Sequence, residues 1–166
     1  MENSIERIGM AQMFVGKAPG IITTIGLGSC VGVTLYDPIN KIGGMLHLML
    51  SDSTRFAFSS SSTMNRAKYA DTGIRDMLDE LINAGARKEN IVAKMAGGAQ
   101  MFAISNDNDM LNIGDRNVEA TRNILEELNI PLMGEDVGAN YGRTVELDLE
   151  NGEFKITTVN REVRFI

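Results

Sequence analysis

The stretch that decides the fold of this chain runs from Thr24 to His47 and reads T-I-G-L-G-S-C-V-G-V-T-L-Y-D-P-I-N-K-I-G-G-M-L-H. Apolar side chains alternate with small or polar ones over residues 31–36, and residues 42–50 form a second apolar run, which predicts two strands. The intervening D-P-I-N at 37–40 suits a type I turn, because Asp favours its first position and the proline ring presets the φ of its second. The stretch therefore predicts a β-hairpin.

This hairpin segment contains the only cysteine and the only histidine of the 166 residues, Cys30 and His47. If Asp37 faces Asn40 across the turn, Cys30 lies opposite His47, where Cβ atoms are about 4.5–5.5 Å apart. A slip of one residue would place the two side chains on opposite faces of the sheet. A bulge at the turn is the alternative, since plain type I turns splay two-residue hairpins. We expect thiol and imidazole to be directly opposed cross-strand partners.

Each member of this pair has a structural explanation as well as a chemical one. A lone cysteine on a strand is more often a small buried hydrophobe, and a lone histidine in an apolar strand is more often a hydrogen-bonded core residue. Together they suggest more, because a buried imidazole needs a partner and a thiol nucleophile needs a base. A thiolate also forms more readily beside an imidazolium. The pair predicts acyl transfer by a cysteine nucleophile, with no metal and no cofactor, since structural zinc requires about four ligands.

Two glycines, Gly26 and Gly28, come just before Cys30. Glycine permits positive φ and close backbone approach, so the amide groups of Ser29 and Cys30 could turn toward one point. That is the requirement for an oxyanion hole, and these two backbone amides are our substrate-binding candidates. The alternative is a tight connection between two strands.

Composition bounds the class of protein. A chain of 166 residues, 43% of them hydrophobic, fits a single domain over residues 1–166. The net charge of −6, with no stripe of Lys and Arg, makes nucleic acid a poor partner. The start M-E-N-S-I-E-R-I-G lacks the features of a signal peptide and no run is apolar enough to insert in a membrane, so we expect a cytoplasmic protein with a free thiol.

The rest of the chain alternates strand and helix patterns. Strands are expected at 8–15, 21–25, 91–96, 144–149 and 154–159, and helices at 64–84 and 115–128. Polar loops are expected at 51–63, 105–112 and 134–143, and the last residues, 160–166, are expected to fray. The first of these loops carries two phenylalanines, which suit either a lid or a linker. The order predicts a mixed sheet covered by two helices, hence an α/β or α+β layered domain.

Several further blocks occur in order: K-Y-A-D-T-G-I, A-K-M-A-G-G-A-Q-M-F, N-I-G-D-R-N-V and E-D-V-G-A-N-Y-G-R. With G-L-G-S-C-V-G-V and G-G-M-L-H-L-M-L they span nearly the whole chain, which resembles the CheD family of chemotaxis proteins. The resemblance implies a single-domain three-layer α/β/α sandwich with mixed, mostly antiparallel sheets and two main helices. It also implies a deamidase that converts glutamines of chemoreceptor cytoplasmic helices to glutamate, and binding to the phosphatase CheC.

The family's catalytic cysteine, histidine and threonine fall on Cys30, His47 and Thr24. Nothing in the composition marks Thr24, because threonine in a β-branched strand is ordinarily there for propensity. The resemblance suggests that it orients His47 through its hydroxyl or its carbonyl, which would set the imidazole tautomer. A non-catalytic adaptor that binds CheC and receptors is the alternative function, and hydrolysis of receptor glutamyl methyl esters is a variant within the enzyme class.

Overall fold

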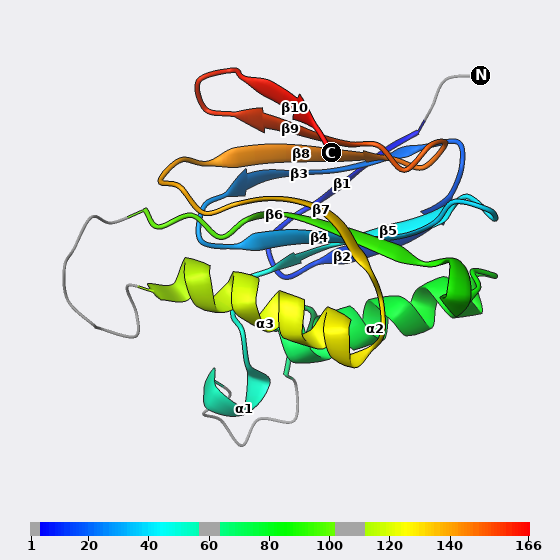
Figure 1. Cartoon of the computed structure of the whole chain (residues 1–166), viewed down its shortest axis with the longest axis horizontal. Coiled ribbons are helices and arrows are strands. Elements are labelled where there is room, and N and C mark those ends of the chain that lie inside the picture. Colours follow the sequence, from blue (N-terminus) through cyan, green and yellow to red (C-terminus); the bar gives the residue numbers. More distant parts are fainter. Residues whose placement is uncertain (1–3, 57–63, 102–111) are drawn as a thin grey trace.

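Two five-stranded sheets lie face to face in the computed structural model, which describes residues 4–56, 64–101 and 112–166 (Figure 1). The β3 sheet has the order β1 (Ile5–Ile8), β3 (Ile21–Leu27), β8 (Arg143–Asp148), β9 (Phe154–Thr158) and β10 (Val163–Phe165). The β4 sheet has the order β2 (Met13–Lys17), β5 (Ile42–Leu48), β4 (Val31–Asp37), β6 (Val92–Gly97) and β7 (Leu132–Val137). Neighbours β1 and β3 are parallel, as are β6 and β7, and the other pairings are antiparallel.

Both long helices cover the face of the β4 sheet that points away from the β3 sheet (Figure 1). Helix α2 (Ala70–Asn83) packs on β2, β4 and β5, and α3 (Ile113–Glu127) packs on β4, β6 and β7. Their buried residues recur at three- and four-residue spacing, which gives each helix one apolar face. Three short elements complete the described chain: α1 (Ser53–Phe56), η1 (Arg66–Lys68) and η2 (Lys88–Asn90).

The predicted α/β class is confirmed, together with two main helices and mixed, mostly antiparallel sheets. The order of the layers differs from the α/β/α expectation, because the layers here are helices, β4 sheet and β3 sheet. Strand burial gives the reason. Every residue of β4 is buried, whereas β8 alternates buried and half-buried residues, so its sheet covers the core with one face only. Among the described residues, no helix covers the outer face of the β3 sheet.

The predicted hairpin of β4 and β5 forms, but its register is not the predicted one. Asp37 pairs with Ile42, so His47 pairs with Gly32, and the prediction that Cys30 lies directly opposite His47 is wrong. The connection spans residues 38–41 and closes with Lys41 in the left-handed region at φ 53°.

The turn chemistry explains the longer connection. The carboxylate of Asp37 accepts hydrogen bonds from the N–H groups of Ile39 and Asn40, at 2.9 and 3.0 Å. Asn40 thus lies within the turn instead of in the facing strand. The pairing moves by two residues, an even number, so Cys30 and His47 still belong to the same face of the β4 sheet.

Other segments depart from the prediction where tertiary pairing overrides local pattern. The predicted strand at 8–15 is interrupted, with residues 9–12 connecting β1 in one sheet to β2 in the other. Residues 132–137 form β7 although 134–143 looked like a loop, because β6 supplies a parallel partner. Residues 163–165 pair with β9 instead of fraying. The expected loops at 51–63 and 105–112 lie largely outside the described residues.

The chain crosses from the β3 sheet to the β4 sheet through residues 28–30. The pairing of β3 with β8 shifts between Thr24 and Leu27, and Gly26 takes φ 78°. The G-x-G motif is thus a strand-to-strand connection, as the alternative interpretation held. It also brings Thr24, at one side of the crossing, and Cys30, at the other, to the same end of the space between the sheets.

Candidate active site

The side chains of Thr24 and His47 meet between the two sheets. Thr24 Oγ lies 2.7 Å from His47 Nδ1 and 2.9 Å from the carbonyl oxygen of Ile8. A carbonyl only accepts, so the single hydroxyl proton of Thr24 goes to Ile8, and the hydroxyl oxygen must accept from His47 Nδ1–H. This arrangement puts the imidazole proton on Nδ1 and leaves Nε2 with its lone pair.

His47 is held by its backbone as well as by its ring. Its N–H donates to the carbonyl of Gln12, and its carbonyl accepts from the N–H of Ala11, at 3.0 and 2.9 Å. The side chain is fully buried, and Nε2 has no hydrogen-bond partner in the described structure. Burial lowers the pKa of His47 to about 4. The imidazole is therefore neutral near pH 7 and able to accept a proton at Nε2.

Cys30 immediately precedes β4 and belongs to the core between the sheets, with 9% of its surface exposed. Burial raises the pKa of its thiol, and the N–H of Cys30 itself partly offsets this by facing the sulfur. No hydrogen bond joins Sγ to His47 in the described part of the chain. The resting groups are thus a neutral thiol and a neutral imidazole.

Three donors orient the peptide groups on both sides of Cys30. The carbonyls of Gly28 and Cys30 accept from the N–H groups of Ala99 and Gly98, at 2.8 and 2.9 Å. The carbonyl of Ser29 accepts from Asn117 Nδ2 at 2.9 Å. Among described residues, the Ser29 and Cys30 amides donate to no other residue. They remain the oxyanion-hole candidates.

The segment that supplies two of these donors is itself tightly built. A Cβ at Gly97, where φ is 112°, would lie 2.3 Å from the Cys30 carbonyl oxygen, so only glycine fits. The buried guanidinium of Arg143 donates to the carbonyl of Gly138 at 3.0 Å and forms an ion pair with Asp136 at 3.0 Å. It also reaches the carbonyl of Gly97 at 3.4 Å. Arg143 thus holds the ends of β6 and β7 beside the Cys30 turn.

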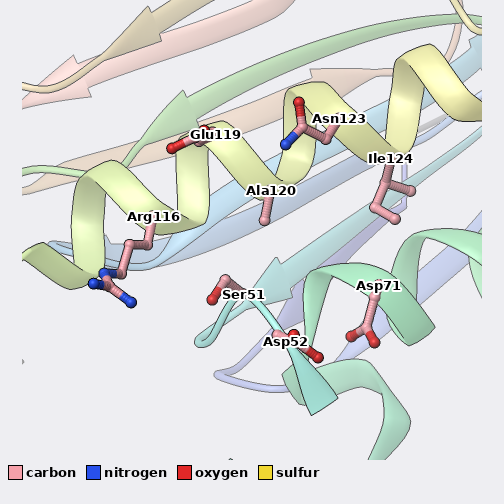
Figure 2. Close-up of a pocket in the computed structure, with 8 residues that line it drawn as sticks. All are labelled: Ser51, Asp52, Asp71, Arg116, Glu119, Ala120, Asn123 and Ile124. Carbon is pink, nitrogen blue, oxygen red and sulfur yellow. The ribbon is translucent and has the colours of Figure 1, made fainter. Parts of the chain in front are cut away.

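The surface is hollowed near these elements. One hollow of about 180 Å³ borders the crossing, between Gly26 and the strands β8 and β9, and includes the exposed side chains of Ile25 and Val159. Another, of about 390 Å³, separates α3 from the segment that follows β5 (Figure 2). Figure 2 shows charged side chains from three segments around it, namely Arg116, Glu119, Asp52 and Asp71. None of Thr24, Cys30 and His47 lines this second hollow.

The structure brings the predicted Thr24 and His47 together, and the backbone groups that support them were not predicted from the sequence. Residues 8–12 were expected to be plain strand, although they provide the carbonyl for Thr24 and the backbone partners of His47. Asn117 was read as part of an amphipathic helix, and no local pattern indicates that its amide reaches the Cys30 turn.

A thiol, a neutral imidazole with a fixed tautomer and the backbone amides beside the thiol are groups that a cysteine-dependent acyl-transfer enzyme uses. The family model described as "CheD chemotactic sensory transduction" matches residues 49–158. Proteins named probable chemoreceptor glutamine deamidase CheD are similar over almost the whole chain. The one from Caldanaerobacter subterraneus subsp. tengcongensis is 48% identical over 166 residues, covering 100% of both chains. The one from Lachnoclostridium phytofermentans is 52% identical over 155 residues, covering 93% of this chain and 94% of its own.

A third relative, named chemoreceptor glutamine deamidase CheD, from Halalkalibacterium halodurans, is 48% identical over 159 residues and covers 96% of both chains. The chain belongs to the CheD family. A solved structure of a Bacillus licheniformis hypothetical protein, YfiH, shows a TM-score of 0.49 at 18% identity, over 77% of this chain and 51% of that one. No described helix has the length and apolar character needed to cross a membrane.

Proposed function

We propose that this protein is a chemoreceptor glutamine deamidase in which Cys30 is the nucleophile, His47 the base and acid, and Thr24 the residue that positions His47. Membership of the CheD family, with relatives bearing that name, supports the reaction. The observation that carries the residue roles is the bond from His47 Nδ1–H to Thr24, because it leaves Nε2 free to take a proton.

In the first half of the reaction, His47 Nε2 takes the thiol proton as Cys30 Sγ attacks the carboxamide carbon of a receptor glutamine. Both groups are neutral at rest, so this proton moves during the attack. The carbonyl oxygen becomes an oxyanion, which the amides of Ser29 and Cys30 would bind. The imidazolium then protonates the departing nitrogen, ammonia leaves, and a thioester joins the glutamyl side chain to Cys30.

In the second half, His47 takes a proton from water, and the hydroxide attacks the thioester carbon. The carbon–sulfur bond breaks, the imidazolium returns its proton to the Cys30 sulfur, and glutamate remains on the receptor. Thr24 accepts from Nδ1–H throughout, so the imidazolium that forms twice keeps a hydrogen bond on the side away from the reaction. No metal or cofactor is required for either half.

The test is incubation of receptor cytoplasmic fragments with wild type and with Cys30→Ala, followed by peptide mapping by mass. Wild type should release ammonia and add about one dalton for each glutamine hydrolysed through the thioester, while Cys30→Ala should do neither. Unchanged receptor peptides after incubation with wild type would overturn the proposed function. Conversion by Cys30→Ala at the wild-type rate would overturn the role of Cys30.

We further propose that residues 1–166 act as one domain in the cytoplasm and bind the phosphatase CheC. The support for this partner is the resemblance of the sequence blocks to the family. Co-purification of CheC with wild type and with Cys30→Ala tests it, because an adaptor role would survive loss of the thiol. If the protein binds CheC and receptors but does not deamidate the receptors, it is the non-catalytic adaptor of the alternative function.

A further inference from the structure

Asn117 is a fully buried amide on the face of α3 that packs against the β4 sheet. Its Nδ2 donates both protons to backbone carbonyls, that of Ser29 at 2.9 Å and that of Met49 at 3.0 Å. The opposite assignment of the amide would put Oδ1 against two carbonyl oxygens, so the orientation is fixed by its surroundings. Among the residues that the structure describes, Oδ1 is buried without a hydrogen-bond partner, which costs free energy.

The two carbonyls flank the reactive pair in the chain. Ser29 directly precedes Cys30, and Met49 comes two residues after His47 at the end of β5. One amide group on a helix therefore ties together the ends of the two segments that carry the thiol and the imidazole. Thr121, one turn further along α3, is buried too, but its hydroxyl donates to the Asn117 carbonyl within the helix.

The bond to Ser29 has a geometric consequence for Cys30. The Ser29 carbonyl and the Cys30 N–H belong to one planar trans peptide, in which C=O and N–H point in opposite directions. Holding the oxygen toward α3 thus aims the Cys30 N–H away from the helix. The preceding peptide is held in the same way, since the Gly28 carbonyl accepts from Ala99.

We propose that Asn117 is a positioning residue for the oxyanion hole, fixing the plane of the Ser29–Cys30 peptide so that the Cys30 N–H meets the developing oxyanion. The inference rests on the proposed deamidase function for its kinetic test. It predicts a specific defect, because a misaimed donor weakens binding of the tetrahedral intermediate and leaves the ground-state receptor complex unaffected. The rate at which Cys30 attacks a reagent that forms no oxyanion should also stay unchanged.

The test uses Asn117→Leu, which keeps the branched shape of the side chain but donates nothing, with Thr121→Val as the matched control on the same helix face. Asn117→Leu should lower kcat for receptor deamidation on the order of tenfold to a hundredfold with KM unchanged, since a whole oxyanion donor is worth about 10²–10³. Iodoacetamide alkylation of Cys30 should stay within about twofold of wild type, because displacement at a saturated carbon forms no oxyanion. Thr121→Val should resemble wild type in both assays.

A spectroscopic readout judges the inference without any catalysis. The chain has one cysteine, so labelling with [15N]cysteine gives a single backbone amide resonance, that of Cys30. The resonance should move in Asn117→Leu and stay in place in Thr121→Val. If thermal unfolding shows that Asn117→Leu does not fold, Asn117→Ala takes its place in both experiments.

The inference would be overturned if the Cys30 resonance did not move in Asn117→Leu. It would also be overturned if this variant had the kcat of wild type, or if its alkylation slowed as much as its deamidation. If wild type deamidates no receptor, the proposed function fails, and the resonance alone then decides whether Asn117 sets the Cys30 peptide. The two failures are therefore distinguishable.

Discussion

Replacing Thr24 by valine removes one hydroxyl from a fully buried site and keeps the shape of the side chain. Two hydrogen bonds disappear, the 2.9 Å bond to Ile8 and the 2.7 Å bond from His47 Nδ1. Leaving a buried donor unpaired costs about 1–3 kcal/mol, and that cost falls on the Nδ1–H tautomer, the only neutral form with a basic Nε2. The imidazolium also loses a charge-assisted hydrogen bond, which is worth about 1.5–3 kcal/mol.

These two losses overlap, because both concern the same Nδ1–H group, so we expect a barrier increase of about 1.5–3 kcal/mol. At about 1.4 kcal/mol per tenfold change in rate, kcat for receptor deamidation should fall roughly tenfold to a hundredfold. The assay is the initial rate of ammonia release from a receptor fragment, with the free energy of unfolding measured in parallel by urea denaturation.

Thr23→Val is the matched control for this substitution. Thr23 is the neighbouring residue of β3, is buried, and donates its hydroxyl to the Val145 carbonyl at 2.8 Å. It should lose about 1 kcal/mol of unfolding free energy and keep its rate within about twofold. Equal rates for wild type and Thr24→Val would refute the tautomer argument, as would an equal loss of rate in Thr23→Val.

Substitutions of His47, Gly97 and Gly138 test the electrostatics and the packing of the site. His47 has a pKa of about 4 when folded and about 6.5 when unfolded, so between these values the unfolded chain binds more protons and stability rises with pH. Acidification from pH 6.5 to 4 should therefore lower the unfolding free energy of wild type by up to about 3 kcal/mol more than that of His47→Gln. If the unfolding free energies of the two proteins change with pH in parallel, the lowered pKa of His47 is contradicted. Gly97→Ala forces a Cβ to within 2.3 Å of the Cys30 carbonyl oxygen, so unfolding free energy should fall by about 3 kcal/mol or more and deamidation should fail. Gly138→Ala, also at positive φ but with open space around its Cβ, should cost only about 1 kcal/mol, and similar losses for the two variants would argue against the contact.

The shared sheet face of Cys30 and His47 was predictable because residue alternation in strands survives an error of two in the register. The two residues belong to the same face whether the turn has two residues or four, although the predicted direct opposition was wrong. The longer turn depended on Asp37 bonding to its own loop, which the sequence motif D-P-I-N permits but does not require.

The supports of the site were not predictable, because they come from segments distant in the chain. The Ile8 carbonyl and the Ala11–Gln12 backbone act through atoms that every residue possesses, so no side-chain pattern marks them. The same holds for β7, which is a strand because β6 lies beside it. The layer order depended on which strands are buried on one face and which on both, a property of the packed sheets.

In the proposed reaction, the one thiol of this chain hydrolyses the side-chain amide of a receptor glutamine through a thioester. The most direct test of this reaction is the intact mass of a receptor fragment after reaction in water enriched in ¹⁸O, with wild type and Cys30→Ala in parallel. Hydrolysis of a thioester places one solvent oxygen in each new glutamate, so wild type should add about three daltons per converted site and Cys30→Ala none. A receptor mass unchanged by wild type, or changed equally by both proteins, would contradict the account.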